Sequence, residues 1–203
     1  MSILLYLAIF IINTVFITVI ADGLIIGIAL PAFRKKQFPK QYLQQVKNRL
    51  DFQKSTECAG FSAAHVLRSF GMDAGGNEMY ARMPGKLWNG AVLPIMLKRC
   101  LKQYGLQVSY RKGSLDTVKA ELCAGKRVIV FIKTRLDKPW LHYVPVVGYD
   151  EEHVFVAESL RDFTNCEELF YNRRLTKGEF SKYWDTRAWY MPFYRNTYLV
   201  IEK

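Results

Sequence analysis

Apolar side chains fill the start of the chain without the regular polar interruptions of an amphipathic helix. Residues 3–20 are 18 positions of mostly apolar side chains, and no lysine or arginine precedes Arg34. A helix of that length is about enough to cross a hydrocarbon core of ~30 Å. Asp22-Gly23 interrupts the run, which then continues to residue 33. The pattern predicts one transmembrane helix with a tilted or interfacial continuation, so that residues 1–33 form an N-terminal membrane anchor.

A short amphipathic pattern follows at residues 58–70. Its apolar residues fall at positions 61, 63, 64, 66, 67 and 70, and Gly71 follows directly. Apolar residues spaced by three and four positions share one face of a helix. A glycine just past the last apolar position is a common helix end. The pattern predicts a helix over 58–70 that buries one face.

The second half of the chain mixes helical and strand patterns. Residues 141–149 are mostly β-branched or aromatic, residues 150–152 are acidic, and residues 154–157 are apolar, which predicts a β-hairpin. The other predicted elements are helix 93–104, strand 106–110, helix 114–124, strand 127–132 and strand 196–202. The region of Gly75-Gly76 is interpreted as a polar loop, and no helix or strand is predicted in the aromatic segment after the hairpin. Helices first and antiparallel strands afterwards predict an α+β fold in one domain, residues 48–203.

The chain is strongly basic, with a formal net charge of +11. Nucleic acid is one class of partner for such a surface, but no RNP-like motif is present, which disfavours it. Six positive residues lie between Arg34 and Arg49. Beside a membrane, such residues attract anionic lipid by about 1 kcal/mol each. We therefore predict a basic juxtamembrane linker, residues 34–47, with membrane lipid as its partner; acidic peptides are a third option.

The same charge asymmetry predicts how the anchor is oriented. Lysine and arginine are enriched on the cytoplasmic side of membrane spans, so we expect a single-pass membrane protein with its catalytic domain in the cytoplasm. A cleaved signal peptide, with Gly27 and Ala29 near the cleavage site, is the alternative and would make the protein secreted. The segment lacks the positive start of a signal peptide and is long for one.

Cys58 is the first candidate for chemistry, because it falls in the first turn of the predicted helix. Ser55 and Thr56 lie just upstream as candidate caps, and the positive end of the helix dipole favours a thiolate there. Gln53, five residues before the cysteine, can offer its amide to an oxyanion that forms beside the sulfur. A buried structural cysteine and a polar loop glutamine are the alternatives.

The predicted hairpin supplies a candidate base and an orienting acid. Folding the chain near residue 150 brings His142 opposite residues 158–160. Glu158 is then placed to accept a hydrogen bond from the imidazole, with Asp162 and Asn165 as alternatives. A thiol, an imidazole and an acid are the groups of cysteine-based acyl transfer.

The remaining histidines and cysteines predict no second site. His65 lies seven residues beyond Cys58, roughly 10 Å along a helix at ~1.5 Å per residue, which is too far for a general base. Cys100, Cys123 and Cys166 form no C-x2-C pair. We therefore predict no metal, no cofactor and no disulfide scaffold.

The two blocks together resemble the bacteriocin-processing (double-glycine leader) peptidases of the papain-like superfamily. The shared features are Gln-x4-Cys-Ala-Gly before a helix, His-Tyr-Val-x-Val-Val-Gly-Tyr-Asp on a strand, and an acidic residue on the next strand. The resemblance implies a papain-like cysteine peptidase fold from about residue 48 to the C-terminus. It also implies that Cys58 is the nucleophile, His142 the base, Gln53 the oxyanion-hole glutamine and Glu158 the third residue. The family usually has aspartate, commonly followed by proline, where this chain has Glu158-Ser159.

These features predict a membrane-anchored cysteine peptidase that hydrolyses a peptide or protein substrate. Two other functions use the same residues. A catalytically silent domain of this fold would bind peptides at the membrane, an alternative raised by Glu158 and by Ala59 where a second glycine often stands. Another thiol acyl-transfer enzyme, an amidase or a transglutaminase-like enzyme, would keep the same triad.

Overall fold

An antiparallel sheet forms the centre of the protein. The structure is a computed structural model and describes residues 3–26, 37–138, 140–187 and 194–203. Within these residues the strands are β1 (Tyr42–Leu43), β2 (Gln107–Lys112), β3 (Arg127–Lys133), β4 (Leu141–Tyr149), β5 (His153–Val156), β6 (Arg173–Thr176) and β7 (Thr197–Glu202). Their order across the sheet is β2-β7-β3-β4-β5-β6, and β1 pairs with the last two residues of β4.

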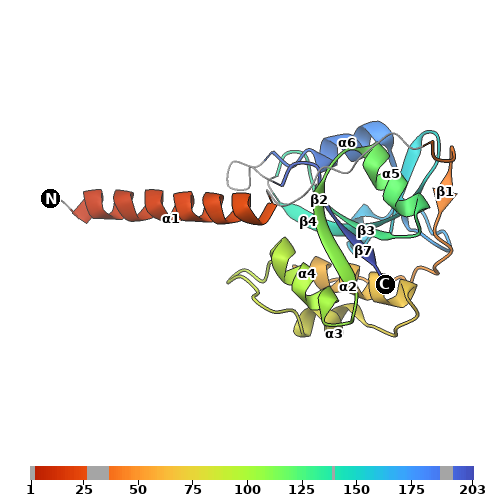
Figure 1. Ribbon diagram of the computed structural model, residues 1–203, viewed down its shortest axis with the longest axis horizontal. Coiled ribbons are helices and arrows are strands. Elements are labelled where there is room, and N and C mark those ends of the chain that lie inside the picture. The colour runs from red at the N-terminus through yellow and green to blue at the C-terminus, as the bar shows by residue number, and fades with distance from the viewer. Residues whose placement is uncertain (1–2, 27–36, 139, 188–193) are drawn as a thin grey trace.

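Helices cover both faces of this sheet (Figure 1). One face carries α2 (Cys58–Ser69), α3 (Gly76–Ala81) and α4 (Pro94–Lys102), the other carries α5 (Leu115–Cys123) and α6 (Lys177–Trp184), and the 3₁₀ turn η1 (Arg161–Phe163) follows β5. Successive side chains of β3 point alternately to the two faces of the sheet and so pack against the two helical layers. Ile129 and Phe131 pack with α2 and α4, whereas Val128, Val130 and Ile132 pack with α5 and α6. Burial on both faces explains why β3 is apolar without interruption.

Most predicted elements are confirmed. The helix predicted over 58–70 is α2, and the predicted hairpin is formed by β4 and β5. The predicted helices 93–104 and 114–124 are α4 and α5, and the three other predicted strands are β2, β3 and β7. The α+β fold, with helices packed on an antiparallel sheet, is therefore confirmed.

Two α-helices, two strands and the turn η1 lie where the sequence pattern predicts no element. The loop expected around Gly75-Gly76 contains α3, the aromatic segment contains β6 and α6, and part of the predicted linker forms β1. Close packing explains the glycine at the start of α3, because a Cβ on Gly76 would come within 2.5 Å of the Phe61 ring. Elements this short are stabilised by tertiary packing and carry little periodicity of their own.

The N-terminal helix, α1 (Ile3–Ile26), stands apart from the sheet and its helices in Figure 1. Its described side chains, those of residues 3–14, are all exposed. Among the residues whose side chains are described, no helix is both long and apolar enough to cross a membrane. Residues 27–33 of the predicted anchor and residues 34–36 of the predicted linker lie outside the described residues. Membrane anchoring therefore stays a prediction.

Candidate active site

Cys58 is the first residue of α2 and lies partly buried in the wall of a cleft. Gly60 lets this helix pack closely, because a Cβ there would come within 2.5 Å of an α3 side chain. The expectation that Ser55 or Thr56 caps the helix is wrong. The cap position is occupied by Glu57, and no side chain forms a capping hydrogen bond. The positive end of the helix is thus left without a side-chain cap beside the sulfur.

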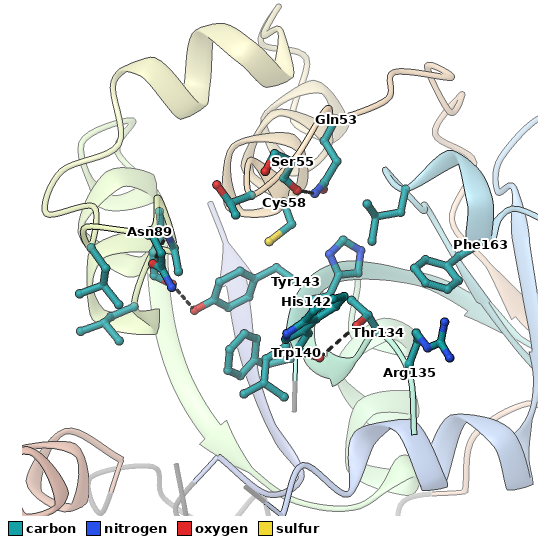
Figure 2. A pocket seen from close by; sticks show the side chains of 18 of the residues that line it. Gln53, Ser55, Cys58, Asn89, Thr134, Arg135, Trp140, His142, Tyr143 and Phe163 are labelled. Atoms are coloured by element: carbon teal, nitrogen blue, oxygen red, sulfur yellow. Dashed lines mark hydrogen bonds between the residues drawn. The ribbon is translucent and has the colours of Figure 1, made fainter. Parts of the chain in front are cut away.

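His142 lies on β4, opposite Ile132 of β3, and is buried. Its Nε2 is 2.7 Å from Oε1 of Glu158. Because Nε2 faces the acid, Nδ1 is the ring nitrogen that remains for a thiol. Figure 2 shows the imidazole beside the Cys58 side chain. The structure therefore brings together the thiol, imidazole and acid that the sequence predicted.

The Glu158 carboxylate is held at both of its oxygens. Oε1 accepts hydrogen bonds from His142 and from the Leu160 N–H, the latter at 2.8 Å, and Oε2 accepts one from Arg173 Nη1 at 2.8 Å. The Asn172 side chain holds the Glu158 backbone, accepting from its N–H at 2.7 Å and donating to its carbonyl at 2.8 Å. A glutamate is one methylene longer than an aspartate, and these contacts fix the longer side chain against the imidazole.

The two alternatives for the third catalytic residue, Asn165 and Asp162, do not occupy the contact with His142 Nε2. Asn165 exchanges hydrogen bonds with the Arg174 backbone, at 2.7 and 2.8 Å. Asp162 lies in η1 and lines the cleft. The hairpin geometry thus brings Glu158 to His142, as its predicted turn position requires.

The His142–Glu158 pair is stable in its charged form. Burial alone lowers the pKa of His142, but the Glu158 charge and the Cys58 side chain outweigh burial and raise the pKa above its ordinary value. Burial alone raises the pKa of Glu158, whereas His142, Arg173 and the Leu160 N–H lower it well below its ordinary value. At neutral pH the pair is an imidazolium and a carboxylate.

Gln53 lines the same cleft as Cys58. Its Nε2 donates a hydrogen bond to the Ser55 carbonyl, and its Oε1 accepts one of 2.7 Å from the Ser159 hydroxyl (Figure 2 shows the first). The backbone N–H of Gln53 donates to the Ser159 carbonyl at 2.9 Å. Gln53 and Cys58 therefore line one cleft, and the oxyanion role of the glutamine stays a prediction.

The cleft has a volume of about 730 Å³, within the usual range for ligand sites. Its apolar lining residues include Leu87, Val92, Phe131, Trp140 and Tyr143. The Tyr143 hydroxyl donates to the Val92 carbonyl at 2.9 Å, which ties β4 to the segment before α4. An open, partly apolar cleft beside a thiol suits an extended peptide.

His65 lies outside this cleft. It is buried on α2, where burial and the nearby Arg68 and Arg127 lower its pKa to about 3, so the ring is neutral. Among the residues that the structure describes, no group of three or more histidine, cysteine, aspartate or glutamate side chains is arranged to hold a metal ion.

A protein-family model decides the family of this chain. The model of the peptidase C39-like family matches residues 38–189, well over half of the 203 residues. The chain belongs to the peptidase C39-like family. No curated protein sequence matches it.

Solved structures show the same fold. A C39-like peptidase from Bacillus anthracis has a TM-score of 0.60 and 15% identity, over 79% of this chain and 97% of its own. The double glycine motif protease of an AMS/PCAT transporter, solved with the leader peptide, has a TM-score of 0.54 and 14% identity, over 79% and 96%. The peptidase domain of Streptococcus ComA, a bifunctional ABC transporter, has a TM-score of 0.54 and 12% identity, over 74% and 95%. The resemblance to double-glycine leader peptidases is confirmed at the level of fold and family.

Three residues of this C39-like site were not predicted from the sequence, namely Ser159, Asn172 and Arg173. Arg173 lies on the buried side of β6, where the sequence analysis assigns no strand, so its burial became evident only from the structure. A buried arginine requires an acidic partner, and Glu158 is that partner. Nothing in the spacing of Asn172 marks it as a clamp on the Glu158 backbone.

The charge of Glu158 has a measurable consequence for pH dependence. A cysteine peptidase mechanism at this site would need His142 protonated, so we expect activity to be lost as the pH rises through the raised His142 pKa. Glu158→Gln removes the charge that raises this pKa. We expect the alkaline limb of kcat/KM to move to lower pH, and kcat to fall by about 10- to 100-fold, less than in Cys58→Ala.

The measurement is kcat/KM for a fluorogenic Gly-Gly amide between about pH 5 and pH 10. Thermal unfolding of the same variant separates catalysis from stability. An unmoved alkaline limb in a folded variant would show that Glu158 does not set the charge of His142.

Proposed function

We propose that this protein is a cysteine peptidase, with Cys58 as nucleophile, His142 as base and acid, Glu158 as orienting acid and Gln53 in the oxyanion hole. The observation that carries the proposal is the buried contact of 2.7 Å between His142 Nε2 and Glu158 Oε1, on the imidazole that lies beside Cys58. It supplies an imidazolium held in one orientation next to a thiol on a helix N-terminus.

Acylation begins when the Cys58 thiolate attacks the peptide carbonyl carbon. The C=O electron pair moves to the oxygen, where Gln53 Nε2 and the Cys58 backbone N–H donate hydrogen bonds to it. The intermediate then collapses as His142 gives its proton to the leaving amine, and the C–N bond breaks. The product is a thioester on the Cys58 sulfur, with a neutral imidazole beside it.

Deacylation restores the site. His142 takes a proton from water, and the water oxygen attacks the thioester carbon. The C–S bond breaks, the acid product leaves, and the thiolate–imidazolium pair is formed again. Glu158 stays ionised throughout and holds the ring in the tautomer that both steps need.

A peptide is the substrate class that we propose, and one structural neighbour supports it, because that double glycine motif protease was solved with a leader peptide. Incubating the full chain, in mild detergent, with a fluorogenic Gly-Gly amide tests the proposal. Release of the fluorophore is the expected result. Binding of the peptide without cleavage would indicate the silent domain, and acyl transfer to an added amine in preference to water would indicate another acyl-transfer enzyme.

We also propose that residues 3–21 anchor the protein, with the catalytic domain on the cytoplasmic side. The absence of lysine and arginine before Arg34 supports this orientation. The described polar side chains of α1 also suit an apolar medium, since Asn13 and Thr14 donate to the helix carbonyls of Ile9 and Phe10 at 2.9 and 2.8 Å.

Carbonate extraction is expected to leave the protein in the membrane fraction. Carbonate releases proteins that are bound only at the membrane surface, whereas an apolar helix that spans the bilayer stays in it. Protease added to intact cells is expected to leave the domain uncut, and the same protease is expected to digest it after lysis. A mature N-terminus near Leu30 would support secretion and contradict the anchor, and digestion in intact cells would contradict the cytoplasmic side.

A further inference from the structure

We propose that Ser159 is a positioning residue for the oxyanion-hole glutamine, Gln53. The inference rests on the proposed function and adds a residue to it. Ser159 follows Glu158 directly, at the position where the resemblance to leader peptidases leads us to expect proline. Proline has no hydroxyl and cannot form the contact that Ser159 forms here.

The chemistry of its neighbours fixes which way the Gln53 amide points. A backbone carbonyl can only accept, so the amide atom that faces the Ser55 carbonyl must be the nitrogen Nε2. The amide oxygen Oε1 then faces Ser159, whose hydroxyl must be the donor of the 2.7 Å hydrogen bond. Nε2 carries two N–H groups. Ser55 uses one, and the other is the donor that we assign to the oxyanion.

Ser159 also joins the two halves of the site. Gln53 precedes α2 and Cys58 is the first residue of α2, whereas His142 lies on β4 and Glu158 lies two residues past the end of β5. Ser159 contacts Gln53 twice, through its hydroxyl and through its carbonyl, which accepts the Gln53 N–H at 2.9 Å. Because Ser159 is itself buried, little space is left for its hydroxyl to move away from Gln53.

Removal of the hydroxyl is expected to weaken oxyanion stabilisation and to leave the reactivity of the sulfur unchanged. In Ser159→Ala, Oε1 of Gln53 loses its donor, so only the Ser55 carbonyl still holds the amide side chain and its nitrogen is freer to move away from the oxyanion. The contact of His142 with Glu158 does not involve the Ser159 side chain. The variant should therefore stabilise an oxyanion poorly while its thiolate keeps its ordinary reactivity.

A pair of probes separates these two properties. Acetyl-Gly-glycinal binds when the Cys58 sulfur attacks the aldehyde carbon and the C=O electron pair moves to the oxygen, which lies in the oxyanion hole and takes up a proton. Iodoacetamide alkylates the same sulfur with loss of iodide and needs no oxyanion donor. For the full-length Ser159→Ala chain we expect the aldehyde Kd to rise about tenfold and the alkylation rate to stay within about twofold.

A double-mutant cycle distinguishes positioning from a general structural role. Ser159→Ala should have no further effect on the aldehyde Kd in a Gln53→Ala background, because the group that Ser159 positions is absent. Ser159→Thr keeps the hydroxyl and should retain most of the affinity. Ser62→Ala is the matched control, because it removes a buried hydroxyl that donates to the Tyr143 carbonyl at 3.0 Å, and it should leave the Kd unchanged.

Two results would overturn the proposal. One is a Ser159→Ala chain that binds the aldehyde as tightly as the unmutated chain does. The other is a loss that persists in full in the Gln53→Ala background, which would assign Ser159 to the fold alone. Failure of the proposed function looks different, because the unmutated chain would then bind no aldehyde and show no preferred alkylation at Cys58.

Discussion

Cys58→Ala is expected to lower kcat for a Gly-Gly amide by at least about 10⁴-fold, the largest effect of any single change in the site. In the proposed mechanism the sulfur forms the bond to the substrate, and among the described residues that line the cleft Cys58 is the only cysteine. The side chain is only partly buried, so we expect the free energy of unfolding to change by less than about 1 kcal/mol. Steady-state hydrolysis and chemical unfolding of the same preparation measure both quantities.

Cys166→Ala provides the matched control. Cys166 is also partly buried, and burial raises the pKa of its thiol, but it does not line the cleft. Hydrolysis by this variant should match that of the unmutated chain. Residual turnover above about a hundredth of normal in Cys58→Ala would mean that another group carries the chemistry.

Arg173→Met is expected to lower the free energy of unfolding at neutral pH by about 3–5 kcal/mol, because it removes one partner of a buried ion pair. Arg173 and Glu158 are 5% and 0% exposed, and their charged atoms are 2.8 Å apart. The guanidinium also lies over the rings of Phe163 and Tyr183, at 5.2 and 5.4 Å. Loss of the arginine leaves Glu158 with His142 as its only charged partner among the described hydrogen-bonding side chains.

This deficit should shrink in acid. In the unmutated chain the pKa of Glu158 is lowered from 4.5 to about 2, so its contribution to stability is complete above about pH 4.5 and is lost as the pH falls toward about 2. Arg173→Met has a smaller shift and loses less on acidification. Unfolding at pH 7 and at about pH 3 tests this, with Arg174→Met as the control, since it removes the same charge from an exposed position on β6. A loss of stability in Arg173→Met no larger than in Arg174→Met would contradict the account.

The sequence was sufficient to predict the site residues that lie on or next to long, regular helices and strands. Cys58 could be placed on a helix because the apolar spacing over 58–70 has a single period, and α2 follows it closely. His142 and Glu158 could be paired because the acidic turn fixes where the hairpin folds, and β4 and β5 pair as that turn requires. In a hairpin, the position of the turn determines which residues of the two strands lie opposite each other. This pairing could therefore be predicted without knowledge of the rest of the fold.

The support around those residues depends on contacts that local spacing does not encode. Ser159 and Gln53 lie 106 positions apart and meet only because the segment before α2 runs beside the hairpin. The cap of α2 was misplaced because Ser55 and Thr56 favour capping locally, whereas the packed helix begins at Cys58. For α6 a local signal did exist, since Thr176 and Glu179 form a capping box at its start.

Competitive alkylation tests the central claim, an activated thiol at Cys58, most directly. At about pH 6 an ordinary thiol is almost wholly protonated and reacts slowly. With iodoacetamide limiting, peptide mapping of the full chain should show Cys58 modified at least about tenfold faster than Cys166, and His142→Ala should abolish that preference. Equal modification of the two cysteines in the unmutated chain, or a preference for Cys58 that survives His142→Ala, would contradict the catalytic pair proposed for this site.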